Sequence, residues 1–182
     1  MTRRLLLVLA CSATFGVAPA LAAGAQAPSP EFQKLDVSIG HWMFQGTQAA
    51  TASRPAQAFT WDEQCDWSPN HLFLECTFSN DWGGRRGKVE SIVVDTYNTT
   101  DKSYWHYELY SIGQTGKNPF ACKMDIDGNV WTEYAREASP GKQNGERIVY
   151  TWESPSRVTV EIKTSKDGKT WTTVDKAEGV RR

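Results

Sequence analysis

The sequence has almost no excess of charge and few histidines, and each shortage argues against a class of function. The formal net charge is −1, from 20 Lys and Arg against 21 Asp and Glu. No basic stripe runs along the chain, so we expect no nucleic-acid partner. The three histidines, His41, His71 and His106, show no metal-ligand spacing, and we expect no metal site. No glycine-rich phosphate loop precedes a helix, and we expect no cofactor.

A long apolar run is also absent, since a membrane-spanning helix needs about 20 residues. The apolar run 5–17 is shorter, follows the basic pair Arg3 and Arg4, and precedes the small-residue sequence Ala20-Leu21-Ala22. A basic start, a short apolar run and a small-residue end are typical of a secretory signal peptide. We therefore predict a signal peptide over residues 1–22 and a periplasmic or secreted protein.

The remainder of the chain has the size of one domain. Residues 23–29 are small and include a proline, and we expect a disordered tail there. Residues 30–182 are predicted to form a single β-barrel domain. Cys11 follows a very short apolar stretch and the bulky Leu9, so a lipid anchor on this cysteine is less favoured than free export.

Alternation of apolar and polar residues predicts β-strands through most of the domain. One example is the stretch 59–67, which a Pro-Asn turn separates from a second alternating stretch at 72–78. Asp127-Gly128 and Asp167-Gly168 suit tight hairpin turns. After a short helix that begins near Pro30, we count about nine or ten strands joined mostly by short loops. Such an antiparallel meander has two unpaired edges unless it closes, so we predict an up-and-down barrel, with a sandwich as the alternative.

Three cysteines remain after export, and an oxidising compartment permits them to form a disulfide. Cys65 and Cys76 fall on the apolar faces of adjacent predicted strands, which favours a bridge between them and leaves Cys122 unpaired. The alternative is three reduced cysteines buried as small apolar side chains.

Three motifs carry a family resemblance. They are Leu35-x-x-x-x-Gly40-x-Trp42, Val94-Asp95-x-Tyr97 and Asp127-Gly128-Asn129-x-Trp131, the last followed by the segment 165–171. Together they resemble exported bacterial lipocalin-like domains of unknown function, which belong to the calycin type of β-barrel. The resemblance implies a barrel with a short N-terminal helix, and structural roles for Gly40 and for Trp42, which plugs the closed end. It implies no catalytic residue.

The strand 103–112 has two contrasting faces. One carries His106 and Glu108, and the other carries Trp105, Tyr107 and Leu109. Because the more apolar face normally points inward, we expect Tyr107 inside and His106 outside. If the phase were reversed, His106 and Glu108 would form a titratable pair inside the barrel, suited to general acid–base catalysis.

A barrel of this size can hold one small ligand. We expect an apolar small molecule as the partner, with Trp61, Phe78, Tyr107 and Tyr134 as candidate lining residues. The first alternative is a lyase, isomerase or hydrolase that acts on a hydrophobic substrate through His106 and Glu108. The second is a protein-interaction module with a filled barrel. The sequence leaves the oligomeric state open.

Glu63 shares the apolar face of its strand with Trp61 and Cys65. A buried carboxylate needs a partner, and Arg136 or Arg147 is expected to supply one. The alternative is a bulge that turns Glu63 to solvent.

Overall fold

The computed structural model describes residues 29–52, 55–81, 88–111, 120–137 and 144–182. The predicted signal peptide and Cys11 lie outside the described residues, as does all but one residue of the predicted tail. The elements, in chain order, are α1 (Pro30–Gln33), η1 (Lys34–Ser38), β1 (Gly40–Gln48), β2 (Gln57–Trp67), β3 (Leu74–Asp81), β4 (Lys88–Asn98), β5 (Ser103–Tyr110), β6 (Phe120–Asp127), β7 (Val130–Arg136), β8 (Gly145–Ser154), β9 (Arg157–Ser165) and β10 (Thr172–Arg181).

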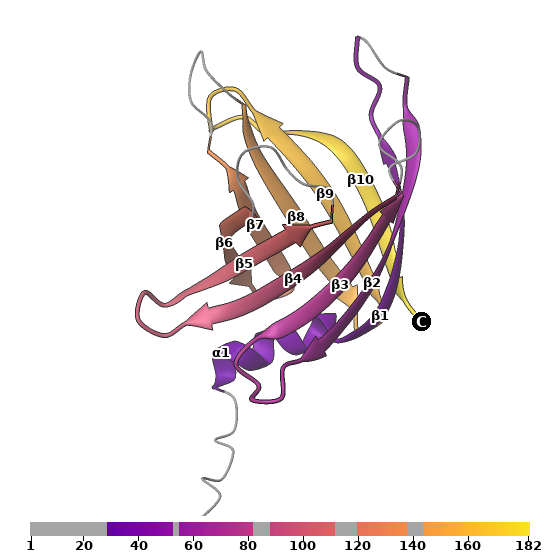
Figure 1. The fold of residues 1–182 in the computed structure, drawn as a ribbon. Helices are drawn as coiled ribbons and strands as arrows, with labels where there is room; N and C mark the ends of the chain where they lie inside the picture. Colours follow the sequence, from indigo (N-terminus) through magenta and orange to yellow (C-terminus); the bar gives the residue numbers. More distant parts are fainter. Residues whose placement is uncertain (1–28, 53–54, 82–87, 112–119, 138–143) are drawn as a thin grey trace, which may run out of the picture.

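The strands form one closed antiparallel barrel, which confirms the predicted fold class (Figure 1). Each strand pairs with its neighbours in the sequence, and β1 pairs with β10 to close the sheet. Closure removes the two unpaired edges that a ten-stranded meander would otherwise expose. No helix among the described residues is long and apolar enough to cross a membrane.

Two of the tight turns are where the sequence places them. Gly128 lies between β6 and β7 with φ of +58°, and Gly168 follows β9 with φ of +72°. Such positive φ angles suit glycine, which has no Cβ to clash with the backbone. The strand after Gly168 is longer than the apolar pattern at 171–174 indicates, because β10 runs to Arg181.

Small residues explain why β10 lacks a clear apolar signal. Its inward positions include Ala177 and Gly179, and the ring of Phe44 on β1 packs directly over Gly179. A Cβ on Gly179 would also lie 2.7 Å from Val158 on β9. The junction of β1 and β10 therefore requires small side chains, and hydrophobic alternation does not reveal it.

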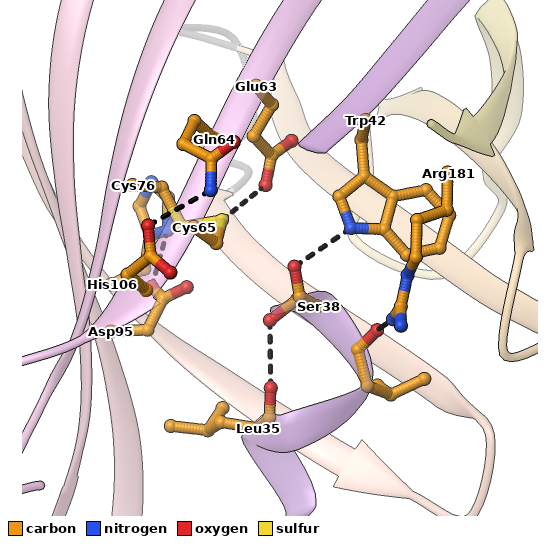
Figure 2. Close-up of a disulfide and its surroundings, with 12 residues drawn as sticks. Leu35, Ser38, Trp42, Glu63, Gln64, Cys65, Cys76, Asp95, His106 and Arg181 are labelled. Carbon is orange, nitrogen blue, oxygen red and sulfur yellow. Dashed lines mark hydrogen bonds and ion pairs between the residues drawn. A yellow bond between two sulfur atoms is a disulfide. The ribbon is translucent and has the colours of Figure 1, made fainter. Parts of the chain in front are cut away.

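The N-terminal helical segment covers one end of the barrel, the lower end in Figure 1. Trp42 is fully buried there, and its indole N–H donates to the carbonyl oxygen of Ser38 at 2.9 Å. The guanidinium of Arg181 lies 4.8 Å from the Trp42 ring centroid and donates to the carbonyl of Val37 at 2.6 Å (Figure 2). Gly40 has φ of +112° at the start of β1, where the chain turns from η1 into the wall. These contacts tie both ends of the domain to the helix and close this end.

Candidate functional site

The opposite half of the barrel contains a cavity of about 520 Å³. Its apolar lining comes from β2, β3, β4, β8 and β9 and includes Trp61, Phe78, Val93, Ile148 and Val160. Its polar lining includes Asn80, His106, Glu108, Tyr110, Glu133 and Tyr150. Both volume and mixed lining lie within the range of small-molecule sites, which are largely apolar with a few converging polar groups.

Strand register brings a histidine and an aspartate together in the interior. Asp95 on β4 lies directly opposite His106 on β5, so both side chains project from the same face of the sheet. Each is less than a tenth exposed. The His106 Nδ1 atom donates to Asp95 Oδ1 at 2.9 Å and lies 3.5 Å from Glu133 Oε1 on β7. His106 is therefore held between two carboxylates from two other strands.

The expectation that Tyr107 points inward is wrong. Tyr107 is 38% exposed on the outer face, and its neighbour Leu109 is 49% exposed. The outer aromatic face is stabilised locally, because Trp105 stacks on Tyr107 and the ammonium of Lys123 lies 5.4 Å from the Trp105 ring centroid. The inward face carries His106, whose burial is offset by the two carboxylates.

Of the other three predicted lining residues, two line the cavity and one does not. Trp61 and Phe78 line the cavity, whereas Tyr134 does not. A register shift after Glu133 displaces the end of β7. The Tyr134 hydroxyl donates to Asp125 at 2.5 Å, and the guanidinium of Arg147 lies 4.9 Å from the Tyr134 ring centroid.

Glu63 is buried rather than turned to solvent by a bulge, but neither proposed arginine is its partner. Arg136 pairs with Glu146 at 2.9 Å, and the Arg147 guanidinium lies 4.1 Å from the Trp171 ring centroid. Both arginines are thus engaged with other side chains, and neither pairs with Glu63.

The surroundings of Glu63 include the disulfide between Cys65 and Cys76, two residues that lie directly opposite each other on β2 and β3 (Figure 2). One carboxyl oxygen of Glu63 lies 2.9 Å from the Cys65 sulfur. A disulfide sulfur has no proton, so a hydrogen bond there needs a protonated carboxyl group as the donor. The three side chains form the only cluster of potential metal ligands in the described chain, yet neither sulfur is a free thiolate.

Burial and charge together shift the pKa values of this cluster. Burial by itself would lower the pKa of His106, but the carboxylates of Glu133, Asp95 and Glu108 raise it to about 10. Burial raises the pKa of Glu133 to about 7, although the positive charge of His106 opposes the rise. Burial and the Asp95 charge raise the pKa of Glu63 to about 8. Near neutral pH the imidazole is thus protonated, Glu63 is mostly a neutral acid and Glu133 is poised between its two states.

Cys122, the one free cysteine among the described residues, belongs to the same interior region. Cys122 on β6 is buried and pairs in register with His106. Burial and the nearby carboxylates of Glu133 and Asp95 raise the pKa of its thiol well above the ordinary value. This environment opposes formation of a reactive thiolate, so the thiol acts as a small buried group.

Sequence reasoning found His106 and Glu108 but not Asp95, Glu133 or Asn80. Glu108 does line the cavity, yet the direct contacts of His106 are Asp95 and Glu133. The sequence signal for these residues is a polar side chain at a strand position that alternation assigns to the apolar, inward face. Asp95 follows Val93 by two positions, and Glu133 follows Trp131 by two. A polar group in a buried phase needs a partner, so such positions point to an interior cluster.

Comparison with known proteins identifies the fold. Rv2717c from M. tuberculosis superposes with a TM-score of 0.55 and 12% identity, over 85% of this chain and 98% of that one. The S-type phycobiliprotein lyase CpeS from Guillardia theta superposes with a TM-score of 0.50 and 12% identity, over 82% of this chain and 91% of that one. No family model and no curated protein sequence matches the chain. The structural likeness at this identity establishes a shared barrel fold.

Proposed function

We propose that this protein is an exported carrier that binds one small, largely apolar molecule inside its barrel. The cavity of about 520 Å³ is the observation that supports this function. It lies inside a wall with no open sheet edge, and its lining combines aromatic and aliphatic side chains with hydrogen-bonding groups. An apolar ligand body would pack against Trp61 and Phe78, while one polar group would contact the wall near His106.

The cavity argues against the filled-barrel alternative, since an interaction module would have no use for internal space of this size. Export is supported by the N-terminal pattern of residues 1–22. A disulfide in the barrel wall suits an oxidising compartment.

Glu133 is the observation that favours a second candidate function. Its pKa of about 7 suits a general acid–base catalyst near neutral pH, and its carboxyl group lines the cavity. Under this alternative Glu133, rather than Glu108, would exchange a proton with a bound hydrophobic substrate, and His106 would position it. The lyase from Guillardia theta has the same fold, so the barrel is compatible with an enzyme as well as a carrier.

Native mass spectrometry of the full chain, expressed with its N-terminal segment and recovered from the periplasm, tests the proposal. We expect a non-covalently bound small molecule at a stoichiometry of one, and an intact mass that shows cleavage near Ala22. A matched pair of variants locates the site. Ile162→Trp places a large ring on the cavity wall, and Leu109→Trp places the same ring on the outer face.

The bound mass should disappear from the Ile162→Trp protein and remain on the Leu109→Trp protein. Equal retention by both variants would place the molecule outside the barrel and refute the carrier function as stated. If the molecule recovered from a Glu133→Gln protein differed chemically from that recovered from the wild type, the enzyme alternative would replace the carrier.

A further inference from the structure

The interior of the barrel has more carboxyl groups than basic groups. Glu108, Glu133 and Glu146 line the cavity, and His106 is the only basic side chain in that lining among the described residues. His106 is already engaged by Asp95 at 2.9 Å, and Glu146 by Arg136 at 2.9 Å. The single imidazolium of His106 therefore faces three carboxyl groups, those of Asp95, Glu133 and Glu108.

This excess of negative charge contributes to the raised pKa values of the interior carboxyl groups. Burial and mutual repulsion hold protons on Glu63 and Glu133 at a pH where a solvated glutamate would be ionised. A positive charge brought into the cavity would relieve the repulsion and allow these protons to leave.

A second, independent feature is an unused hydrogen-bond acceptor. Asn80 on β3 lines the cavity with 9% of its surface exposed, and within the described part of the chain its Oδ1 atom has no hydrogen-bond partner. A buried acceptor without a donor is destabilising, because it has lost its hydrogen bonds to water. The cavity therefore presents both an acceptor and an excess of carboxylate, and a ligand that supplies N–H donors and positive charge would satisfy both.

We infer that the natural ligand of this cavity is an amine, an apolar molecule with one protonated amino group that pairs with the carboxylates of Glu108 and Glu133, while Asn80 offers a further acceptor in the same lining. This inference rests on the proposed function and specifies its ligand class. The aromatic and aliphatic lining takes the body of the molecule, and the carboxylates take the ammonium group. An anionic ligand is disfavoured, because the imidazolium of His106 already faces Asp95 and Glu133, and a further carboxylate would add to the excess of negative charge in a site of low dielectric constant.

Binding of an ammonium group has a consequence for pH dependence. The charged and titratable side chains around it are Glu63, Asp95, His106, Glu108, Tyr110, Cys122, Glu133, Glu146 and Tyr150. Because the cation favours ionised carboxyl groups, protons are released when it binds. An alkylammonium ion keeps its proton up to a pH of about 10. Affinity for the amine should therefore rise by about tenfold between pH 6 and pH 8, as Glu133 ionises.

Three probes with one apolar body test the inference: naphthylethylamine, naphthylethanol and naphthylpropionate, each titrated into the full chain by isothermal calorimetry. We expect the amine to bind most tightly and the carboxylate most weakly. Only amine affinity should rise with pH, and its heat of binding should depend on the ionisation heat of the buffer. Glu108→Gln should weaken amine binding by about tenfold and leave alcohol binding within about threefold. Glu75→Gln, on the exposed outer face of β3, is the matched control and should change neither.

Each outcome separates the two proposals. Binding of the alcohol or the carboxylate as tightly as the amine would overturn the amine inference and leave the carrier function intact. Loss of all binding in Glu108→Gln, alcohol included, would indicate a damaged cavity, and Asn80→Leu then serves as the second variant, expected to weaken the amine more than the alcohol. Equal weakening of both probes in that variant would overturn the inference. If none of the probes binds and native mass spectrometry finds no bound molecule, both proposals fail.

Discussion

Replacement of His106 by Gln removes a basic side chain that lies directly against the interior carboxylates of Asp95 and Glu133. The change keeps a side chain that can donate a hydrogen bond to Asp95, and it deletes the positive charge between Asp95 and Glu133. Since the imidazole is only 6% exposed, solvent screens this charge poorly. We expect a large loss of stability, of the order found when one partner of a buried ion pair is removed, about 3–5 kcal/mol.

The magnitude can also be worked from the proton affinity of the imidazole. The pKa of His106 is raised from 6.5 to about 10 in the folded protein. At 1.36 kcal/mol for each tenfold change in proton affinity, the charged imidazole stabilises the fold by about 4–5 kcal/mol at most. Because the folded pKa is the higher one, this contribution is complete below pH 6.5 and is lost as the pH rises through 10. About 4 kcal/mol should remain at pH 7 and less than about 1 kcal/mol at pH 10.

Urea denaturation followed by tryptophan fluorescence at pH 7 and pH 10 measures both values. The difference in unfolding free energy between wild type and His106→Gln should be about 4 kcal/mol at pH 7 and should nearly vanish at pH 10. His41→Gln is the control, because His41 pairs with Asp62 at the surface, where ion pairs contribute at most about 1 kcal/mol. A difference of the same size at both pH values would refute the reasoning, since it would arise from packing rather than from charge.

Other substitutions test separate parts of the fold by the same denaturation assay. Loss of the disulfide, in a Cys65→Ser and Cys76→Ser double variant, should lower stability by about 3 kcal/mol, the chain-entropy value for a sequence separation of 11, and reductant should then have no further effect. Gly46→Ala should be destabilising by about 3 kcal/mol, because the new Cβ would lie 2.6 Å from a β10 carbonyl oxygen. Gly128→Ala should be destabilising by only about 1–2 kcal/mol, through its positive φ. Equal losses of stability would contradict the close packing of β1 on β10. Trp42→Phe should lose about 2–3 kcal/mol through the missing hydrogen bond and reduced packing at the closed end, and a neutral result would mean that the plug is dispensable.

The wild-type protein should itself become less stable as the pH rises. The pKa values of Glu63 and Glu133 are raised from 4.5 to about 8 and about 7, so the folded state holds these protons more tightly than the unfolded state does. The stability they contribute is present below pH 4.5 and is lost by about pH 8, and the loss from His106 follows up to pH 10. A stability that increases from pH 5 to pH 9 would contradict the buried positions of all three groups.

Much of the wall was predictable from local patterns. Alternation with period two identified most strands, and Asp-Gly pairs marked the hairpin turns. The register of β2 and β3 follows from their short connection, and it explains why Cys65 and Cys76 lie opposite each other. The end of β10 was not predictable in this way, because Ala177 and Gly179 leave space for neighbouring rings and give no apolar signal.

The sequence by itself determined that the chain is an antiparallel meander of short alternating strands, and it favoured closure into a barrel over a sandwich because closure pairs both edges. It also determined which residues of each strand share a face. Only the tertiary structure decided which face of β5 points inward. His106 can be buried because Asp95 and Glu133 lie beside it, and Glu133 approaches from the opposite side of β6. Alternation contains no information about partners on other strands, so the local preference for an inward Tyr107 was overridden by a charge cluster that forms only when β4, β5 and β7 come together in the sheet.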